Sequence, residues 1–531
     1  MASSPRPDAT VPDLSVFDYL FGGLAEGDLD TVAIVDGTSG ATTTYRQLVG
    51  QIQLLAGALA ARGVGVGDVV AVLCPNVPAF ATVFHGILRS GATATTVNSL
   101  YTPDEIANQL TDAGARWFFT VSPLLPQAAA AAARVGIADD HLVVLDGAEG
   151  HPSLRDLLGE GRAAPDVSFD PAEHLAVLPY SSGTTGRPKG VMLTHRNLVA
   201  NVAQNVESIG LESSDRVLAV LPFFHIYGMT VLLNYALKCR ASLVTMPKFD
   251  LAEFLRVIGE YGATWLFIAP PIAVALAKHP LVAQADLSSV KVVFSGAAPL
   301  DGSLAEAVAE RLDCVVCQGY GMTETSPVTH VIALDRPDLD RSSIGHLLPS
   351  TEARVVDVES GADVDVPDDG ASEPGELWIR GPQVMKGYLG NPEATAEMLD
   401  ADGWLHTGDI ATVTADGVYR IVDRLKELIK YKGYQVAPAV LEAVLLGHPK
   451  IADAAVIGVR DADGQEIPKA FIVAQADAEL DADEVISFVA EHVAPHEKVR
   501  AVEFIDVVPK STAGKILRKD LRAREAATTG A

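Results

Sequence analysis

The sequence predicts an α/β protein with a large N-terminal domain of mostly parallel sheets covered by helices and a small, mobile α+β C-terminal domain. The chain has 531 residues, of which 48% are hydrophobic, and this is more than one hydrophobic core usually organises. Apolar, β-branched runs alternate with helix-like segments through roughly the first 320 residues. Such alternation is typical of parallel sheets covered by helices.

The expected elements follow in a regular order. A β-rich subdomain is expected at about 351–421, where short apolar runs alternate with Gly, Pro and Asp turns. We place the domain boundary at the charged junction DRLKELIK, which gives a large N-terminal domain at 1–425 and a small C-terminal domain at 426–531. The expected strands are Val69–Pro75, Thr93–Asn98, Trp117–Ser122, Arg216–Pro222, Ser242–Pro247, Thr264–Pro270, Val290–Ser295 and Cys314–Gln318, and the expected helices are Ala79–Arg89, Leu251–Gly262 and Leu300–Leu312.

The segment Tyr180–Gly190, with the sequence YSSGTTGRPKG, is the clearest functional signal. Its glycines allow backbone N–H groups to form a concave anion site, its hydroxyls add donors, and Lys189 adds a positive charge. It differs from a Walker A loop, which needs GxxxxGK[ST] at the start of a helix. Strand-like residues lie on both sides, so we expect a phosphate-binding loop between two strands.

Three polar motifs follow predicted strands directly: FHIYG at 224–228, SGAAP at 295–299 and QGYGMTE at 318–324. In open α/β sheets, ligands bind beyond the carboxyl ends of the strands. The three loops are therefore expected to converge on one cleft.

Charge and composition exclude other classes. The formal net charge is −28, so a nucleic-acid partner is not expected, and a polyanionic substrate must meet local basic residues. The start of the chain lacks the pattern of a secretory signal. The uncharged run Val217–Leu237 is interrupted by Pro222 and His225 among others, so it predicts a buried strand, a turn and a buried helix. We expect no integral membrane segment and a soluble, cytoplasmic protein.

The chain has four cysteines, Cys74, Cys239, Cys314 and Cys317. The last two form a CVVC pair in an apolar, strand-like run, where positions i and i+3 face opposite sides. We therefore expect buried core thiols in a reducing compartment and no metal or redox site.

Eight motifs together resemble the adenylate-forming acyl-CoA synthetases, and among them the 4-coumarate–CoA ligases most. They occur in the family's order over nearly the whole chain. The motifs are YSSGTTGRPKGVMLTH, LPFFHIYG, SGAAPL, QGYGMTE, PGELWIRG, GWLHTGD, DRLKELIKYKGYQVAP and PKSTAGKILRKDLR.

The resemblance implies carboxylate activation in two half-reactions. A carboxylate first attacks the α-phosphate of Mg-ATP, which gives an acyl-adenylate and pyrophosphate. The thiol of coenzyme A then attacks that anhydride, which gives a thioester and AMP. The C-terminal domain is expected to rotate between the two steps. The implied cofactors and partners are ATP, Mg²⁺, coenzyme A and a small-molecule carboxylic acid.

The resemblance also assigns residues to the nucleotide site. Tyr320 is expected to stack on the adenine, Asp409 and Arg424 to hold the ribose, Thr323 to lie near the α-phosphate, and Glu324 to bind Mg²⁺, since a hard carboxylate oxygen suits this ion. The full set for ATP or AMP is Ser181, Ser182, Gly183, Thr184, Thr185, Lys189, Gly296, Ala297, Ala298, Gln318, Gly319, Tyr320, Gly321, Met322, Thr323, Asp409, Arg424, Gln435 and Lys515.

Other roles are implied for the mobile parts. Lys515 matches the lysine that bridges carboxylate and phosphate oxygens during adenylation, a role that suits a flexible point charge. Lys426 matches the hinge, and Lys430 and Gln435 match residues that face the adenylate during thioester formation. The coenzyme A channel is matched by Lys248, Lys432 and Gly433. The implied catalytic residues are Lys515, His225, Thr323 and Lys430, with His225 as a gating histidine; His195 is interpreted as structural.

The acyl pocket departs from the plant 4-coumarate ligases, which typically have Asn where this chain has Thr230 and Lys where it has Phe294. The pocket therefore loses a charge and gains a ring. Cinnamate-like acids are expected, and medium-chain fatty acids remain an alternative. The implied pocket residues are His225, Ile226, Tyr227, Thr230, Phe294, Gly296, Gly319, Pro327 and Val328.

Other readings differ in class. A stand-alone adenylation domain that loads a carrier protein is disfavoured by YKGYQVAP and Lys248, which indicate coenzyme A. A luciferase-like oxygenase would need a luciferin. A catalytically silent nucleotide-binding protein would be expected to lack Lys515 or Glu324.

Overall fold

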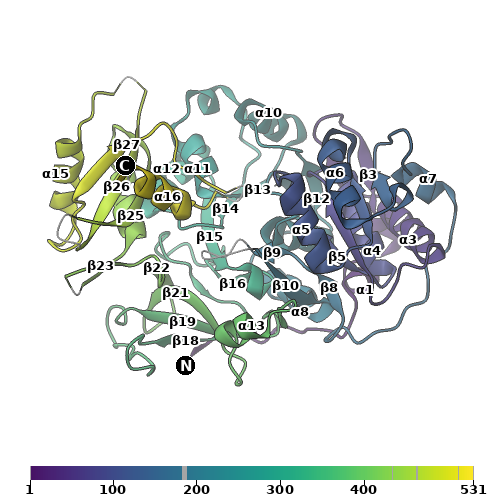
Figure 1. Ribbon diagram of the computed structural model, residues 1–531, viewed down its shortest axis with the longest axis horizontal. Coiled ribbons are helices and arrows are strands. Elements are labelled where there is room, and N and C mark those ends of the chain that lie inside the picture. The colour runs from purple at the N-terminus through teal and green to yellow at the C-terminus, as the bar shows by residue number, and fades with distance from the viewer. Residues whose placement is uncertain are drawn as a thin grey trace.

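The computed structural model describes residues 2–181, 188–432, 434–461, 465–476, 478–511 and 514–529. Two large sheets with flanking helices form the N-terminal part of the molecule, a β-rich sheet lies below them, and the C-terminal part lies to one side (Figure 1). The predicted α/β fold with a separate C-terminal domain is confirmed.

The first large sheet has the strand order β20-β10-β8-β5-β4-β6-β7, and β9 pairs with β10. The run from β8 through β7 is parallel, whereas β10 is antiparallel to both β8 and β20. The strands are β4 (Val69–Leu73), β5 (Thr93–Thr96), β6 (Trp117–Thr120), β7 (Leu142–Val144), β8 (Leu175–Val177), β9 (Tyr180–Ser181), β10 (Lys189–Thr194) and β20 (Gly387–Tyr388).

Helices that accompany this sheet follow ordinary capping rules. In α5 (Pro103–Ala113), for example, Thr102 and Glu105 form a capping box, and Gly114 ends the helix in the left-handed region with φ 66°. The others are α1 (Val16–Phe21), α2 (Glu26–Leu29), α3 (Tyr45–Ala61), α4 (Pro78–Arg89), α6 (Leu125–Val135), α7 (Leu154–Gly159) and α8 (His195–Val206).

The second large sheet has the strand order β17-β16-β15-β14-β13-β11-β12-β2-β3. Its central strands, from β15 through β2, are parallel. The strands are β2 (Val32–Asp36), β3 (Thr42–Thr44), β11 (Arg216–Ala219), β12 (Ser242–Thr245), β13 (Trp265–Ile268), β14 (Val292–Ser295), β15 (Val315–Gly321), β16 (Val328–Val331) and β17 (His346–Leu347), with helices α10 (Leu251–Tyr261), α11 (Pro270–Lys278) and α12 (Gly302–Leu312).

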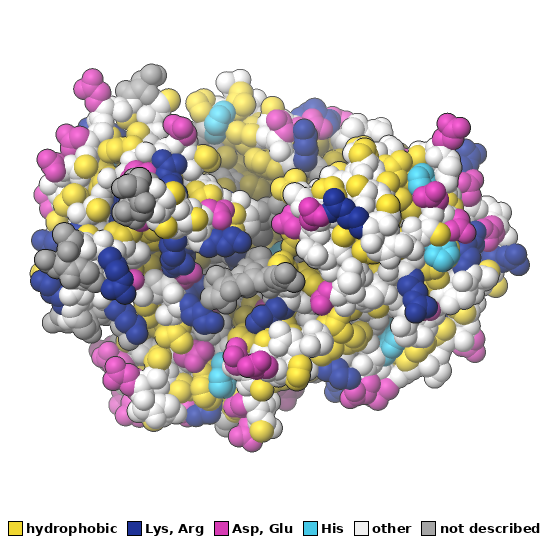
Figure 2. Space-filling model, viewed as in Figure 1, with side chains coloured by type: hydrophobic (Ala, Val, Ile, Leu, Met, Phe, Trp, Pro, Cys, Tyr) yellow, Lys and Arg dark blue, Asp and Glu magenta, His cyan; other side chains and the backbone are white. Residues whose placement is uncertain are grey.

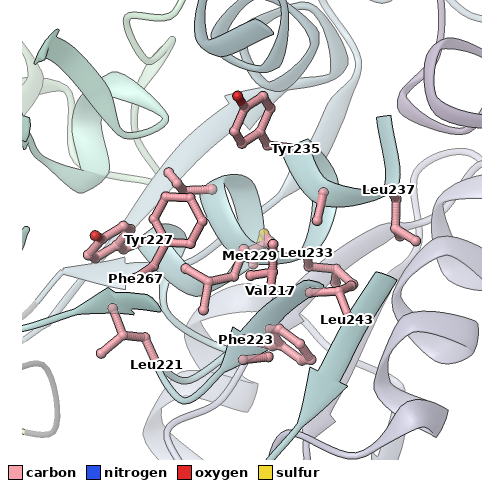
Figure 3. Close-up of a cluster of buried hydrophobic side chains, with 14 of the residues drawn as sticks. Val217, Leu221, Phe223, Tyr227, Met229, Leu233, Tyr235, Leu237, Leu243 and Phe267 are labelled. Atoms are coloured by element: carbon pink, nitrogen blue, oxygen red, sulfur yellow. The ribbon is translucent and has the colours of Figure 1, made fainter. Parts of the chain in front are cut away.

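The uncharged run 217–237 is a buried strand, a turn and a buried helix, as predicted. After β11 the chain turns and enters a π-helix at Tyr227–Asn234, which continues as α9 (Tyr235–Lys238). Its side chains pack in the apolar cluster of Figure 3, where Val217, Phe223 and Met229 come together. In the described part of the chain, no helix combines the length and apolar character needed to cross a bilayer.

The β-rich sheet is antiparallel, with the order β1-β18-β19-β21-β22. The prediction located it correctly but ended it too early, and it missed β1, which comes from the start of the chain and pairs Ala2 with Ala353. The elements are β1 (Ala2–Ser3), β18 (Glu352–Val356), β19 (Gly375–Arg380), α13 (Pro392–Met398), β21 (Leu405–Val413) and β22 (Tyr419–Arg424).

The C-terminal part has its own core, which includes Leu441, Val456, Ile472 and Val489. A hairpin precedes a three-stranded sheet with helices around it (Figure 1). The elements are β23 (Ile429–Tyr431), β24 (Tyr434–Val436), α14 (Pro438–Leu446), β25 (Ile451–Arg460), β26 (Glu466–Ala474), α15 (Ala482–His492), β27 (Ala501–Phe504) and α16 (Arg518–Thr529).

The cysteines are all free. Cys74 and Cys317 are buried as expected, but Cys239 and Cys314 are only partly buried, so the expectation of buried thiols is wrong for these two. Cys314 lies just before β15 and Cys317 within it, because the strand begins at Val315.

Candidate active site

The three polar loops lie at one edge of the second sheet. They follow β11, β14 and β15, which run parallel in one layer with β13 between the first two. The three loops therefore share one edge of the sheet, as the sequence predicted, and the cleft between them stays a prediction. The boundary of the third loop was wrong, because β15 continues through Gly321 and pairs there with antiparallel β16.

The segment after β14 is tied to β15 by one side chain. Gln318 Nε2 donates to the carbonyl of Arg341 at 2.6 Å, and its Oε1 accepts from the Leu300 N–H at 3.2 Å. The amide of Gln318 therefore orders the loop that contains Gly296, Ala297 and Ala298. Ala297 has a φ of 72°, a left-handed conformation that is uncommon for a residue with a side chain.

The expected phosphate loop joins two paired strands, as predicted. Ser181 in β9 lies opposite Lys189 in β10. Ser182, Gly183, Thr184 and Thr185 lie outside the described residues. On the face shown in Figure 2, Lys and Arg side chains gather in the middle of the molecule, although the chain as a whole is acidic.

Asp409 and Arg424, which were assigned to the ribose, form an ion pair between neighbouring strands, with Asp409 Oδ1 3.2 Å from Arg424 Nε. The Tyr320 hydroxyl donates to Asp409 Oδ2 at 2.5 Å. Asp409 is 5% exposed. The buried carboxylate of Asp409 is thus held by Arg424 and Tyr320, and Tyr320 is the residue expected to stack on the adenine.

Lys515 enters this site from the C-terminal part of the molecule. Burial and, to a lesser extent, the nearby Arg424 lower the pKa of Lys515 to about 8, against the opposite influence of Asp409 and Glu324. Gly514 beside it has a φ of 80° and lies so close to α11 that an added Cβ would stand 3.2 Å from Ala269 Cβ and 3.2 Å from Pro271 Cδ. The structure therefore shows the lysine docked into the large domain.

His225 is half-buried at the start of the FHIYG turn. Burial lowers its pKa to about 4, and the positive charge of Lys515 contributes. Its Nδ1 accepts from the Tyr227 N–H at 3.3 Å, which leaves Nε2–H as the donor of a neutral imidazole. A neutral donor of this kind suits a carboxylate substrate.

Glu324 and Thr323 lie in a short turn after β15. Glu324 is 6% exposed, and its Oε1 accepts a hydrogen bond from the Tyr388 hydroxyl at 2.8 Å. Met322 N–H and Thr325 Oγ1 close the turn at 3.1 Å. Gly321 is required here, because a Cβ would stand 2.0 Å from the carbonyl oxygen of Pro327.

The residues assigned to the acyl pocket pack around two rings. A Cβ on Gly296 would stand 2.7 Å from the Tyr227 ring, and one on Gly319 would stand 2.8 Å from the Phe294 ring, so glycines let both rings lie against the strands. Phe294 packs on Phe267 with ring centroids 5.4 Å apart; Tyr227 and Phe267 are labelled in Figure 3. Thr230 lies in the same π-helix as Tyr227, and Ile226 directly precedes that helix. Val328 is the first residue of β16, and Pro327 directly precedes that strand.

The described hinge and coenzyme A residues lie at the surface of the molecule in this conformation. Lys248, Lys426, Lys430 and Lys432 are exposed. In Figure 1 the hairpin strand β23, which carries Lys430, lies at the edge of the molecule, whereas β9 and β10 lie near its centre. Gln435 faces Lys430 across this hairpin, and Gly433 lies outside the described residues.

Sequence reasoning missed Tyr388, which contacts both Glu324 and Lys189, and also missed the contact of Gly514 with α11. The signal for Gly514 was present in PKSTAGK, where a glycine next to the lysine marked a backbone requirement. His195, interpreted as structural, begins α8 and does not end a strand; it is buried, and its Nδ1 accepts from the Val16 N–H at 3.1 Å.

Comparison with known proteins agrees with this geometry. The family model described as AMP-binding enzyme matches residues 24–389, and the model described as AMP-binding enzyme C-terminal domain matches residues 440–515. Among curated relatives, 4-coumarate–CoA ligase 5 of Oryza sativa subsp. japonica is 41% identical, covering 99% of this chain and 97% of the relative. 4-Coumarate–CoA ligase 2 of Solanum tuberosum is also 41% identical, covering 99% and 96%.

Solved structures give the same result. The anthranilate CoA ligase AuaEII in complex with anthranoyl-AMP superposes with a TM-score of 0.90 at 26% identity, covering 98% of both chains. ATP-bound MatB from Rhodopseudomonas palustris superposes with a TM-score of 0.86 at 30% identity, covering 97% of this chain and 99% of MatB. The chain therefore belongs to the AMP-binding enzyme family, the adenylate-forming acyl-CoA synthetases.

Proposed function

We propose that this enzyme converts 4-coumarate- and cinnamate-type acids into their coenzyme A thioesters through an acyl-adenylate. The observation that carries the proposal is the docked Lys515, which approaches Asp409, Arg424 and Glu324 from the other domain. Such a convergence of charges suits a phosphoryl centre. The plant relatives named 4-coumarate–CoA ligase support the choice of acid, since they match over nearly their whole length.

In this proposal the first domain spans 1–425 and the lid spans 426–531, with Lys426 as the hinge. Asp409 and Arg424 hold the ribose, Tyr320 packs on the adenine, and Lys515 stabilises the charge that develops as the substrate carboxylate attacks the α-phosphorus. His225 donates to the same carboxylate. After rotation, Lys430 and Gln435 replace Lys515, and coenzyme A enters past Lys248, Lys432 and Gly433.

Mg²⁺ is implied by the family, and the residues fit it. Mg²⁺ in nucleotide enzymes is usually held by one or two carboxylates together with substrate phosphates, and Glu324 is a buried carboxylate beside the docked lysine. Glu324 would hold the ion, which offsets the negative charge of the phosphates when bound. The protein's own contribution is to keep this carboxylate fixed.

The acyl pocket supports an aromatic acid. Tyr227 and Phe294 provide ring walls, and the Oγ1 of the fully buried Thr230 has no hydrogen-bond partner among the described residues. A buried hydroxyl without a partner costs free energy, and a phenolic hydroxyl on the substrate would supply one.

The test compares AMP formation, with and without coenzyme A, for 4-coumarate, cinnamate and octanoate. We expect both aromatic acids to have higher kcat/KM values than octanoate, and product release as AMP to require coenzyme A. Thr230→Val should lower kcat/KM for 4-coumarate relative to kcat/KM for cinnamate by about tenfold or less. The lost interaction is one neutral hydrogen bond, which contributes about 0.5–1.5 kcal/mol. Thr230→Ser, which keeps the hydroxyl, is the matched control.

Two outcomes would contradict the proposal, one for the acid and one for the acceptor. A clear preference for octanoate would identify a medium-chain fatty acyl-CoA synthetase, and adenylate formation without transfer to coenzyme A would favour a domain that loads a carrier protein. An equal effect of Thr230→Val on both aromatic acids would remove Thr230 from hydroxyl recognition.

A further inference from the structure

A short segment links two parts of the nucleotide site that are far apart in sequence. Met385 N–H donates to the carbonyl of Glu324 at 2.8 Å, and Leu389 N–H donates to the carbonyl of Gly190 at 2.9 Å. Between them, β20 pairs antiparallel with β10, with Tyr388 opposite Val191. The turn that carries Glu324 and the strand that carries Lys189 are therefore joined through the backbone of 385–389.

The Tyr388 side chain makes the same connection. Its hydroxyl donates to Glu324 Oε1 at 2.8 Å, and the ammonium of Lys189 lies over its ring, 4.8 Å from the centroid. Tyr388 is 5% exposed, and its N–H donates to Thr395 Oγ1 at 2.9 Å. One fixed side chain thus contacts both a carboxylate and a lysine of the site.

This arrangement keeps the two charged groups apart. Within the described residues, Lys189 and Glu324 form no ion pair with each other; the tyrosine ring satisfies the lysine by a cation–π contact, and its hydroxyl satisfies one carboxylate oxygen. A direct ion pair between Lys189 and Glu324 would leave neither charge free to interact with a ligand. With Oε1 occupied by Tyr388, Oε2 is the oxygen of Glu324 left for a cation.

We propose that Tyr388 is a positioning residue that orients Glu324 toward a divalent cation and holds Lys189 ready for the nucleotide phosphates. The inference rests on the proposed function, because it assumes Mg-ATP as the substrate. Partners of this kind behind a metal-binding carboxylate typically affect metal affinity by about 10–100-fold. Tyr388 acts through Glu324 and touches no reacting atom.

The test measures ATP binding by calorimetry with Mg²⁺ and in EDTA, and Mn²⁺ binding to the enzyme–ATP complex by electron paramagnetic resonance. Tyr388→Phe keeps the ring under Lys189 and removes only the hydroxyl. We expect the Mn²⁺ affinity of the complex to fall by about 10–100-fold, while ATP affinity in EDTA stays within about twofold, because the lysine contact survives.

The matched control is Tyr45→Phe. Tyr45 is also fully buried, and its hydroxyl donates to the carbonyl of Ala241 at 3.1 Å, in the core of the large domain. This variant should leave both affinities unchanged. Because both substitutions remove one hydroxyl from a buried ring, a shared effect would reflect general destabilisation.

Glu324→Asp tests the same contact from the other side, since the shorter carboxylate withdraws from the tyrosine hydroxyl. It should weaken Mn²⁺ binding, and adding Tyr388→Phe should cause little further loss, as expected for two residues that act through one interaction. Additive losses, or an equal loss of ATP affinity with and without the metal in Tyr388→Phe, would overturn the assignment. A wild-type enzyme that binds no ATP would instead refute the proposed function.

Discussion

Asp409 and Arg424 face each other across β21 and β22, and their side chains form an ion pair of 3.2 Å. This pair lies beside Lys515, with Arg424 disfavouring the charged ammonium and Asp409 favouring it. The residues proposed to hold the ribose therefore also shift the pKa of the residue proposed to act on the phosphate, in addition to the larger effect of burial.

Lys515→Ala should impair one half-reaction only. Removing one preorganised charge contact from a transition state costs on the order of 10²–10³-fold in rate, so adenylate formation should fall by that factor. Supplied with synthetic acyl-adenylate and coenzyme A, the same variant should make thioester at close to the wild-type rate. Pyrophosphate release and thioester formation are measured separately. Equal losses in the two assays would show that Lys515 serves both.

The pH dependence of adenylation should report the lowered pKa of Lys515. The charged ammonium is the active form, and its pKa in the free enzyme is about 8. The kcat/KM for ATP in the adenylation reaction should therefore decline as pH rises through about 8, since this parameter reports the free enzyme. Lys515→Arg, which keeps its charge up to about pH 12, should lose this decline even if its activity is lower.

As pH rises, the deprotonation of Lys515 should increase the stability of the folded protein, whereas it should decrease the rate of adenylation. Between about 8 and the usual value of 10.5 the unfolded chain binds the proton on Lys515 and the folded protein does not, so stability from this group rises with pH over that window. If the adenylation rate and the melting temperature both fell as pH rose through this window, the loss of rate would therefore not come from Lys515. Melting curves at each pH separate the two.

Gly514→Ala should weaken the docked conformation. The new Cβ would stand 3.2 Å from Ala269 Cβ at a residue with a φ of 80°, and strain of this kind costs of order 1–3 kcal/mol. We expect adenylation to fall about tenfold or more, because about 1.36 kcal/mol is a factor of ten in rate, with a smaller effect on thioester formation from synthetic adenylate.

Gly361→Ala is the control for this substitution. Gly361 has a φ of 70°, and nothing lies within 4 Å of the added Cβ, so the control carries backbone strain without a contact between domains. If it slowed adenylation as much as Gly514→Ala, the contact with α11 would have no part in catalysis.

Asp423→Ala should loosen the junction between the domains. The carboxylate of Asp423, at the end of β22, accepts from the N–H of Ala439 in the first turn of α14 at 2.9 Å, across the proposed hinge. Loss of such a cap costs about 0.5–2 kcal/mol. We expect slower adenylation and faster trypsin cleavage at the exposed Lys426.

The control here is Asp416→Ala, an exposed aspartate in the turn between β21 and β22. It should alter neither rate. Unchanged proteolysis and unchanged adenylation in Asp423→Ala would exclude Asp423 as a link between the domains.

The sequence predicted the parallel strands well because buried strands are continuous apolar runs. Trp265–Ile268 and Val292–Ser295 are examples. It also predicted that the loop at 180–190 joins two strands, although β9 and β10 extend into that segment as far as Ser181 and Lys189. These features depend on local pattern and on the rule that parallel strands end at one edge.

The remaining features depend on pairing between distant segments, which local pattern does not encode. Nothing near Gly387–Tyr388 indicates that these two residues pair with β10, since a strand of this length has no periodicity of its own. The link from Tyr388 to Glu324 follows from that pairing. The docking of Gly514 on Pro271 joins two domains. It too is a contact between segments that are distant in sequence, so local pattern does not predict it.

The pairing of Ala2 with Ala353 in the β-rich sheet imposes an order on biosynthesis. The first residues leave the ribosome long before their partner strand β18 has been made, so β1 stays unpaired at least until β18 is synthesised. Pairings this distant in sequence form late and slowly. We expect the N-terminal strand to be among the last elements to become protected in pulse-labelled hydrogen exchange during refolding.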